Sequence, residues 1–173
     1  QILRIFSNAG QGFSSLFSAF YEMITGEKCE NIYKAMDKAL ETGENDDSLQ
    51  ISTKLCGTRE DPTLRGEIKN LGIDNFTPVQ LMNGFLGGMV SEITDMISST
   101  DCVIKSLVGS GNGLRKNIPL QRRFSKALGC EMAIPLNREE AAFGAALTAL
   151  VAGKIKPDLS AAQQLVQYES VNL

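Results

Sequence analysis

The amino-acid sequence predicts an α/β fold in which short strands alternate with helices and neighbouring strands run parallel. One observation is that the second half of the chain alternates helix, strand, loop, helix, strand and helix patterns. Another is that a glycine-rich turn, GSGNG at 109–113, joins an apolar run to a helical pattern. The length of 173 residues and the hydrophobic content of 43% suit one domain with a core of its own.

In the first half, apolar residues recur at helical spacing from Phe13 to Ile24, and Gly26 is placed to end that helix. ILRIFS before it reads as a strand, because it is a short apolar run followed by the turn residues NAGQG. The expected elements are a strand at 2–7, a turn at 8–12, helices at 13–26 and 31–43, an acidic turn at 44–48, a strand at 49–53 and a turn-rich segment at 56–72.

The clearest helix is predicted over 76–98. Thr77 is a good N-cap, Pro78 fits the first helical position and Gln80 stands where a capping box needs it. The buried stripe is expected to contain Leu81, Phe85, Leu86, Met89, Ile93 and Met96. Each glycine costs a helix about 1 kcal/mol relative to alanine, so close packing against another backbone is expected at Gly84, Gly87 and Gly88.

The second half supplies the alternation that defines the fold class. Gly129 and Gly153 are expected to end two helices, and Asn137 to cap the second of these with Glu140 at the capping-box position. The expected elements are a buried strand at 102–108, the loop at 109–113, helix 117–128, strand 130–136, helix 139–153 and a tail with one short helical stretch.

Composition excludes several classes of function. The net charge of −3 and the isoelectric point near 5.1 do not favour a nucleic-acid partner, and no apolar run is long enough to cross a membrane. The chain has no histidine, which rules out a Ser-His-Asp triad and His-ligated metals. No metal site is expected.

The cysteines have no metal-binding spacing. They are expected to be small buried thiols in a reducing compartment, and no secretory signal is visible, so we expect a cytoplasmic protein. The four positions are Cys29, Cys56, Cys102 and Cys130.

The glycine loop admits three interpretations from its residues alone. Gly109 and Gly111 give the start of a dinucleotide fingerprint, with Glu131 at a suitable distance downstream, but Leu114 stands where the third glycine should be. A P-loop would need GxxxxGK[ST], which is absent. A purely structural turn stays open, as does a loop that holds a phosphate or a flat ring against its backbone.

Four stretches in this order carry a resemblance to a known family: NAGQGFSSLF (8–17), GTREDPTLRG (57–66), NFTPVQLMNGFLGGMVSEI (75–93) and SLVGSGNGLRKNIPLQRRFSKALG, followed by EEAAFGAALTAL. Together they resemble the C-terminal domain of the FGGY carbohydrate kinases, and within the family they are most similar to the sedoheptulokinase-like branch.

The resemblance implies a ribonuclease-H-like, actin-like ATPase domain, with helices packed on a mixed sheet. Residues 1–173 would be the nucleotide-binding C-terminal domain without its first strands, and the N-terminal sugar-binding domain, with the catalytic base, would be absent. The parent protein would transfer the γ-phosphate of Mg²⁺-ATP to a hydroxyl of sedoheptulose or another ketose. The isolated chain would be inactive, and it could form a homo-oligomer through its uncovered surface.

By position, the resemblance places the loop residues against adenine or ribose, although the family often has glycine at Asn112. Arg115 and Asn117 could reach the nucleotide, but Arg115 could equally be a solvated helix-start residue. The same resemblance makes Gly10 a glycine at a helix start near the nucleotide, and Ser14 either a facing polar group or a solvated one. The nucleotide-binding residues implied are Gly10, Ser14, Gly109, Ser110, Gly111, Asn112, Arg115 and Asn117.

Other matched positions are interpreted as structural. Arg59 in the segment 57–59 is expected to tie loops together through Asp61. Glu139 and Glu140 are expected to cap a helix. A second hypothesis for the whole chain remains: a kinase-derived module that binds a nucleotide or a protein without catalysis.

Overall fold

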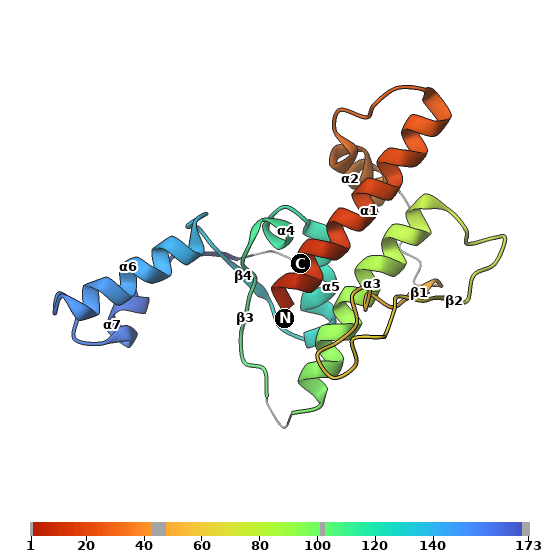
Figure 1. The fold of residues 1–173 in the computed structure, drawn as a ribbon. Helices are drawn as coiled ribbons and strands as arrows, with labels where there is room; N and C mark the ends of the chain where they lie inside the picture. Colours follow the sequence, from red (N-terminus) through yellow and green to blue (C-terminus); the bar gives the residue numbers. More distant parts are fainter. Residues whose placement is uncertain (1, 43–47, 101–102, 171–173) are drawn as a thin grey trace. The chain divides into compact units, whose positions relative to one another are not determined.

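A computed structural model describes residues 2–42, 48–100 and 103–170 of the chain (Figure 1). The chain divides into two compact units, Gln1–Cys102 and Val103–Leu173. Within the described residues, no helix combines the length and the apolar character that a membrane span requires.

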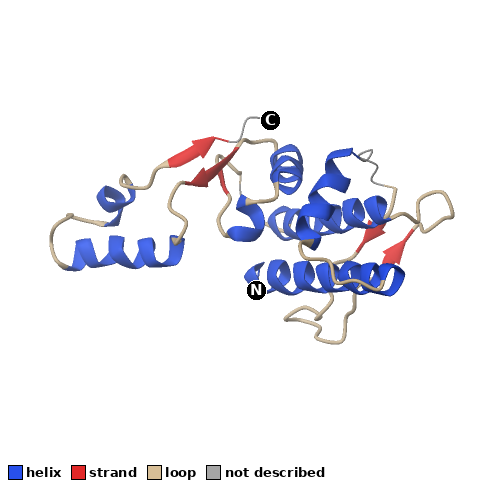
Figure 2. Cartoon of the chain, turned by 90° about the horizontal axis from the view of Figure 1, so that it is seen from above, coloured by secondary structure: helices blue, strands red, loops and turns tan. Residues whose placement is uncertain are grey.

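The first unit is built around one central helix, α3 (Pro78–Ser98). The helices α1 (Ile2–Thr25) and α2 (Ile32–Thr42) contact α3, and so does the strand β1 (Gln50–Ile51). β1 pairs in antiparallel fashion with β2 (Ile68–Lys69), a strand that the sequence did not predict within its turn-rich segment. Figure 2 shows these helices and the small two-stranded sheet from above.

The predicted strand at 2–7 and turn at 8–12 are wrong, because α1 is one continuous helix from Ile2. The apolar run has helical spacing as well, since Ile2, Phe6, Ala9 and Phe13 follow one another at intervals of three or four residues. The predicted end of the helix is confirmed: Gly26 follows it with φ 73°. The expected acidic turn falls mostly outside the described residues.

At Gly84 and Gly88, α3 packs closely against another backbone, as the sequence predicted, and that backbone is the stretch 49–51. A Cβ at Gly84 would lie 2.8 Å from the Leu49 carbonyl oxygen, and one at Gly88 would overlap the Ile51 carbonyl oxygen. Thr77 caps the helix by accepting a hydrogen bond from the Gln80 N–H at 3.2 Å. α3 and β1 are therefore in direct backbone contact.

The expected buried stripe of α3 is only partly correct. Phe85, Leu86 and Met89 are buried, whereas Leu81 and Ile93 are half-buried and Met96 is exposed. The buried hydrophobic residues of this unit are Leu49, Ile51, Met82, Phe85, Leu86, Met89 and Val90. They place the core between α3 and β1.

The second unit contains a three-stranded mixed sheet in the order β3-β4-β5. β3 (Leu107–Val108) and β4 (Met132–Pro135) run parallel, as predicted, and β5 (Tyr168–Ser170) pairs antiparallel to β4. The helices are α4 (Asn112–Arg115), α5 (Ile118–Leu128), α6 (Glu140–Ala152) and α7 (Leu159–Gln163). The sequence did not predict β5, and β3 is shorter and more exposed than the buried strand expected at 102–108.

Helix ends in this unit confirm some local predictions and correct others. Gly129 ends α5 in the left-handed conformation with φ 65°. Asn137 does not cap α6, which begins at Glu140 with no side-chain cap at Glu139. At the other end Gly153 has φ −77°, and the left-handed residue is Lys154 with φ 58°.

The cysteine prediction is also corrected. Cys56 is exposed, while Cys29 and Cys130 are half-buried, so none of the three described thiols belongs to a core. Cys102 lies outside the described residues. The core of the second unit contains Leu120, Phe124, Met132, Ile134, Leu147 and Ala162.

Candidate functional site

The GSGN loop, residues 109–112, leaves the carboxyl end of β3 and enters α4. The Gly109 N–H donates to the Ala133 carbonyl oxygen at 2.9 Å, which continues the parallel pairing beyond the strand. A Cβ at Gly109 would lie 2.5 Å from Met132 Sδ and 2.6 Å from Leu114 Cδ2. Gly109 therefore packs tightly on the core beneath the loop, and a side chain there would displace the ends of the Met132 and Leu114 side chains.

Gly111 sets the direction of the loop. It has φ 88° and ψ 153°, a backbone conformation open to glycine, and it precedes the first residue of α4. Asn112 is already helical and has no positive φ, so asparagine at this position needs no left-handed conformation. Ser110, Asn112 and Gly113 are exposed, and nothing lies within 4 Å of a Cβ built on Gly113. The loop thus presents an open surface beside its backbone.

Arg115 and Glu140 clamp the loop to the end of β4 and the start of α6. Glu140 Oε1 accepts hydrogen bonds from the Gly111 N–H at 3.3 Å and from Arg115 Nη2 at 2.5 Å. Arg115 Nη1 donates to the Pro135 carbonyl oxygen at 2.6 Å, and Nη2 also donates to that of Asn137 at 3.0 Å. The guanidinium thus joins α4 to the single stretch 135–140, which lies 20 to 25 positions further along the chain.

The clamp also determines the charge of the site. The Arg115 side chain is 18% exposed and that of Glu140 is 27% exposed. The hydrogen bond from Arg115 holds the pKa of the Glu140 carboxyl below its ordinary value, with further help from the N–H groups of Glu140 and Gly111. Partial burial acts in the opposite direction but is the weaker influence. Glu140 is therefore ionised at neutral pH.

The Gln121 side chain of α5 holds the end of α4 in place. The buried Gln121 donates from Nε2 to the Leu114 carbonyl oxygen at 2.7 Å and to the Arg115 carbonyl oxygen at 3.1 Å. Asn117 caps α5, because its Oδ1 accepts the Leu120 N–H at 3.0 Å. Sequence reasoning missed Gln121, although a glutamine directly after Leu120 on an amphipathic helix was a visible signal.

Six of the eight residues predicted for the site lie on or beside this loop: Gly109, Ser110, Gly111, Asn112, Arg115 and Asn117. Arg115 is not a solvated helix-start residue, since its terminal nitrogens bond to protein atoms. Asn117 has a capping role. The predicted capping role of Glu140 is incomplete, because Glu140 also bonds to Gly111, which is 29 positions away in the sequence.

The other two predicted residues belong to the first unit and have different settings there. Gly10 lies inside α1 rather than at a helix start, so the physical reason given for it is wrong. Ser14 is buried and accepts a hydrogen bond from Tyr33 Oη at 3.1 Å, which joins α1 to α2. Solvation, the alternative interpretation of Ser14, is therefore also wrong.

The turn at 57–65 is structural, as predicted, but not through Arg59. Gly57 has φ 73°, and a Cβ there would lie 2.6 Å from the Pro62 carbonyl oxygen. Within this described turn, the Asp61 carboxylate accepts both the N–H and the hydroxyl of Thr63, instead of pairing with Arg59. These hydrogen bonds lower the pKa of Asp61.

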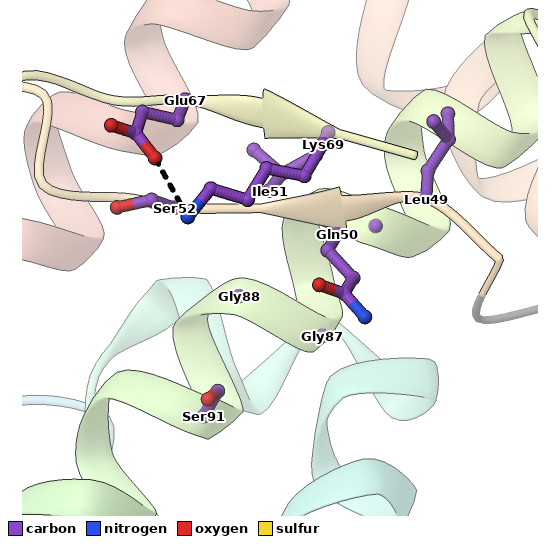
Figure 3. Close-up of a pocket in the computed structure, with 10 residues that line it drawn as sticks. Leu49, Gln50, Ile51, Ser52, Glu67, Lys69, Gly87, Gly88 and Ser91 are labelled. Carbon is purple, nitrogen blue, oxygen red and sulfur yellow. Dashed lines mark ion pairs between the residues drawn. The ribbon is translucent and has the colours of Figure 1, made fainter. Parts of the chain in front are cut away.

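A groove of about 570 Å³ lies in the first unit beside β1 and α3 (Figure 3). Gly87, Gly88 and Ser91 form its helical side, and an ion pair between Lys69 Nζ and Glu67 Oε2 at 3.0 Å lines its strand side. Both charged side chains are mostly exposed and already satisfy each other. None of the residues predicted for the site lines this groove.

No protein-family model and no curated protein matches the chain. Solved structures do. A xylulose kinase from Rhodospirillum rubrum matches with a TM-score of 0.72 at 18% identity over 95% of this chain and 33% of that one. A Plasmodium falciparum glycerol kinase with ADP matches with a TM-score of 0.66 at 21% identity, over 91% of this chain and 31% of that one. A gluconate kinase from Lactobacillus acidophilus matches with a TM-score of 0.68 at 16% identity, over 84% of this chain and 30% of that one.

The chain spans about a third of the length of these proteins. At such low identity the likeness concerns the fold, and it agrees with the mixed sheet and the surrounding helices described above. The chain therefore has part of the ribonuclease-H-like, actin-like ATPase fold that these solved sugar kinases contain.

Proposed function

We propose that this chain is the C-terminal, nucleotide-binding part of an ATP-dependent carbohydrate kinase and that the GSGN loop holds the adenosine part of ATP. The observation that carries the proposal is the loop itself: a glycine turn at the carboxyl end of a parallel strand, where ligands bind in open α/β sheets. The fold of the chain is similar to that of solved sugar kinases, one of which was solved with ADP.

The loop residues fit a flat ring. Gly109 keeps the backbone close to the sheet, Gly111 turns it through φ 88°, and the space beside Gly113 is open. Ser110 and Asn112 are exposed on this surface and offer hydroxyl and amide groups to a base or a ribose. Arg115 serves the site by fixing the loop.

The parent protein would transfer the γ-phosphoryl group of ATP to a sugar hydroxyl, on sedoheptulose or another ketose. Magnesium would reach the site bound to the phosphates of ATP, since the described residues contain no cluster of His, Cys, Asp or Glu that could hold a metal ion. Phosphoryl transfer also needs a group that orients the attacking hydroxyl, and we assign that group to an N-terminal sugar-binding domain. We expect the isolated chain to bind nucleotide weakly, to be inactive and to be cytoplasmic.

Two measurements test this function. Isothermal titration of the 173-residue chain with ADP should show binding that is weakened in Gly111→Ala and unchanged in Glu139→Gln. The full-length parent should phosphorylate one member of a panel of ketoses, gluconate and glycerol in a coupled ADP-release assay. A parent that binds ATP but phosphorylates no sugar or polyol would refute the kinase and favour a non-catalytic binding module.

A further inference from the structure

The backbone N–H of Gly111 already has an anion bound to it. This donor lies in the middle of the GSGN loop, where a phosphate group could otherwise accept its hydrogen bond. The Glu140 carboxylate occupies it instead, with 3.3 Å between Oε1 and the amide nitrogen. A ligand anion at this position would have to displace a carboxylate that belongs to the chain.

The cation beside the loop is also neutralised. Arg115 places its charge next to Glu140, with 2.5 Å between Nη2 and Oε1, and its two terminal nitrogens also bond to the carbonyl oxygens of Pro135 and Asn137. The arginine that follows the loop is thus already paired, and the exposed cation next to it in the chain is Lys116. Removing the carboxylate would at once free the Gly111 donor and leave the charge of Arg115 unpaired.

We propose that Glu140 is a specificity-determining residue that excludes anionic groups from the GSGN loop and restricts it to the uncharged part of a ligand. The identity of the ligand as a nucleotide rests on the proposed function, whereas the exclusion of anions rests on the clamp. Loss of one charge at about 6 Å from an anion in a solvated site should change its affinity roughly three- to tenfold.

The test compares the wild-type 173-residue chain with Glu140→Gln and with the control Glu139→Gln. Glu139 is the adjacent carboxylate, is exposed and makes no side-chain cap. The probes are inorganic tripolyphosphate and adenosine, each titrated while the amide signals of residues 109–113 are followed by NMR. The ratio of tripolyphosphate to adenosine affinity should rise roughly three- to tenfold in Glu140→Gln and stay unchanged in Glu139→Gln. Equal ratios in all three proteins would overturn the proposal.

A second measurement separates this inference from the proposed function and does not depend on the variant's folding. In the wild type and in Glu139→Gln, the Gly111 amide proton should shift as Glu140 titrates below the ordinary carboxyl range, with Arg115 as its charged partner. A Gly111 signal that does not respond to this titration would overturn the proposal. If adenosine and ADP fail to bind while tripolyphosphate still distinguishes the proteins, the nucleotide function fails and the anion exclusion stands.

Discussion

Substitution of Gly111 by alanine tests whether the loop conformation is needed. Gly111 has φ 88° and ψ 153°, and no atom lies within 4 Å of a Cβ built there, so the cost is conformational and not steric. Holding an ordinary residue in such a conformation costs about 1–3 kcal/mol. If the loop rearranges to avoid this strain, the binding-competent conformation becomes about 5- to 150-fold rarer, and the apparent affinity for ADP falls by the same factor.

Gly113→Ala is the matched control for stability. The position lies in α4 and a Cβ there meets open space, so alanine should favour the helix by about 1 kcal/mol. Urea unfolding followed by far-UV circular dichroism should therefore shift the midpoint down for Gly111→Ala and up for Gly113→Ala. ADP titration of Gly111→Ala completes the test. An unchanged midpoint and an unchanged ADP affinity in Gly111→Ala would refute the claim that the loop requires its positive φ.

Three further predictions concern the packing and the clamp. Gly88→Ala should lower the free energy of unfolding by about 3 kcal/mol, because its Cβ would meet the Ile51 carbonyl oxygen, whereas Gly144→Ala in α6 meets open space and should not destabilise the chain in urea. Arg115→Lys should cost about 1–3 kcal/mol in the same assay, because an ammonium cannot reproduce the fork of hydrogen bonds, and retention of full stability would contradict the clamp. The difference in the free energy of unfolding between the wild type and Glu140→Gln should have its full size above the ordinary carboxyl pKa. It should shrink as the pH falls through the lowered pKa of Glu140. A difference that stays the same in acid would argue against the ion pair.

Local signals in the sequence predicted local structure well. Thr77 caps α3 and Gly129 ends α5, because each effect depends on a few neighbouring residues. The segment 2–7 was assigned incorrectly because a short apolar run fits a strand as well as a helix. The run itself does not show that it belongs to the helix that follows. In the folded chain that helix, α1, contacts α2 and α3, and these contacts cannot be seen in the sequence of the run.

In the candidate site, too, the sequence predicted the local feature and not the contacts between distant residues. The GSGN loop could be found because the glycines follow an apolar run directly, and the structure has it at the end of β3. The role of Glu140 could not be found, since its partners Gly111 and Arg115 are 29 and 25 positions away. A carboxylate in the first turn of a helix has a sufficient local explanation in capping, and only the fold reveals the distant one.

The position of Gly10 within α1 removes the physical reason for expecting Gly10 to lie near the nucleotide. Gly10 was attractive because the positive end of a helix dipole favours a phosphate. Since α1 begins at Ile2, that end lies about 12 Å before Gly10 at 1.5 Å per residue, beyond the first turn in which the dipole acts. Ser14 is already engaged with Tyr33. The case for nucleotide binding therefore rests on the second unit, where an internal carboxylate at Gly111 favours an uncharged group over a phosphate.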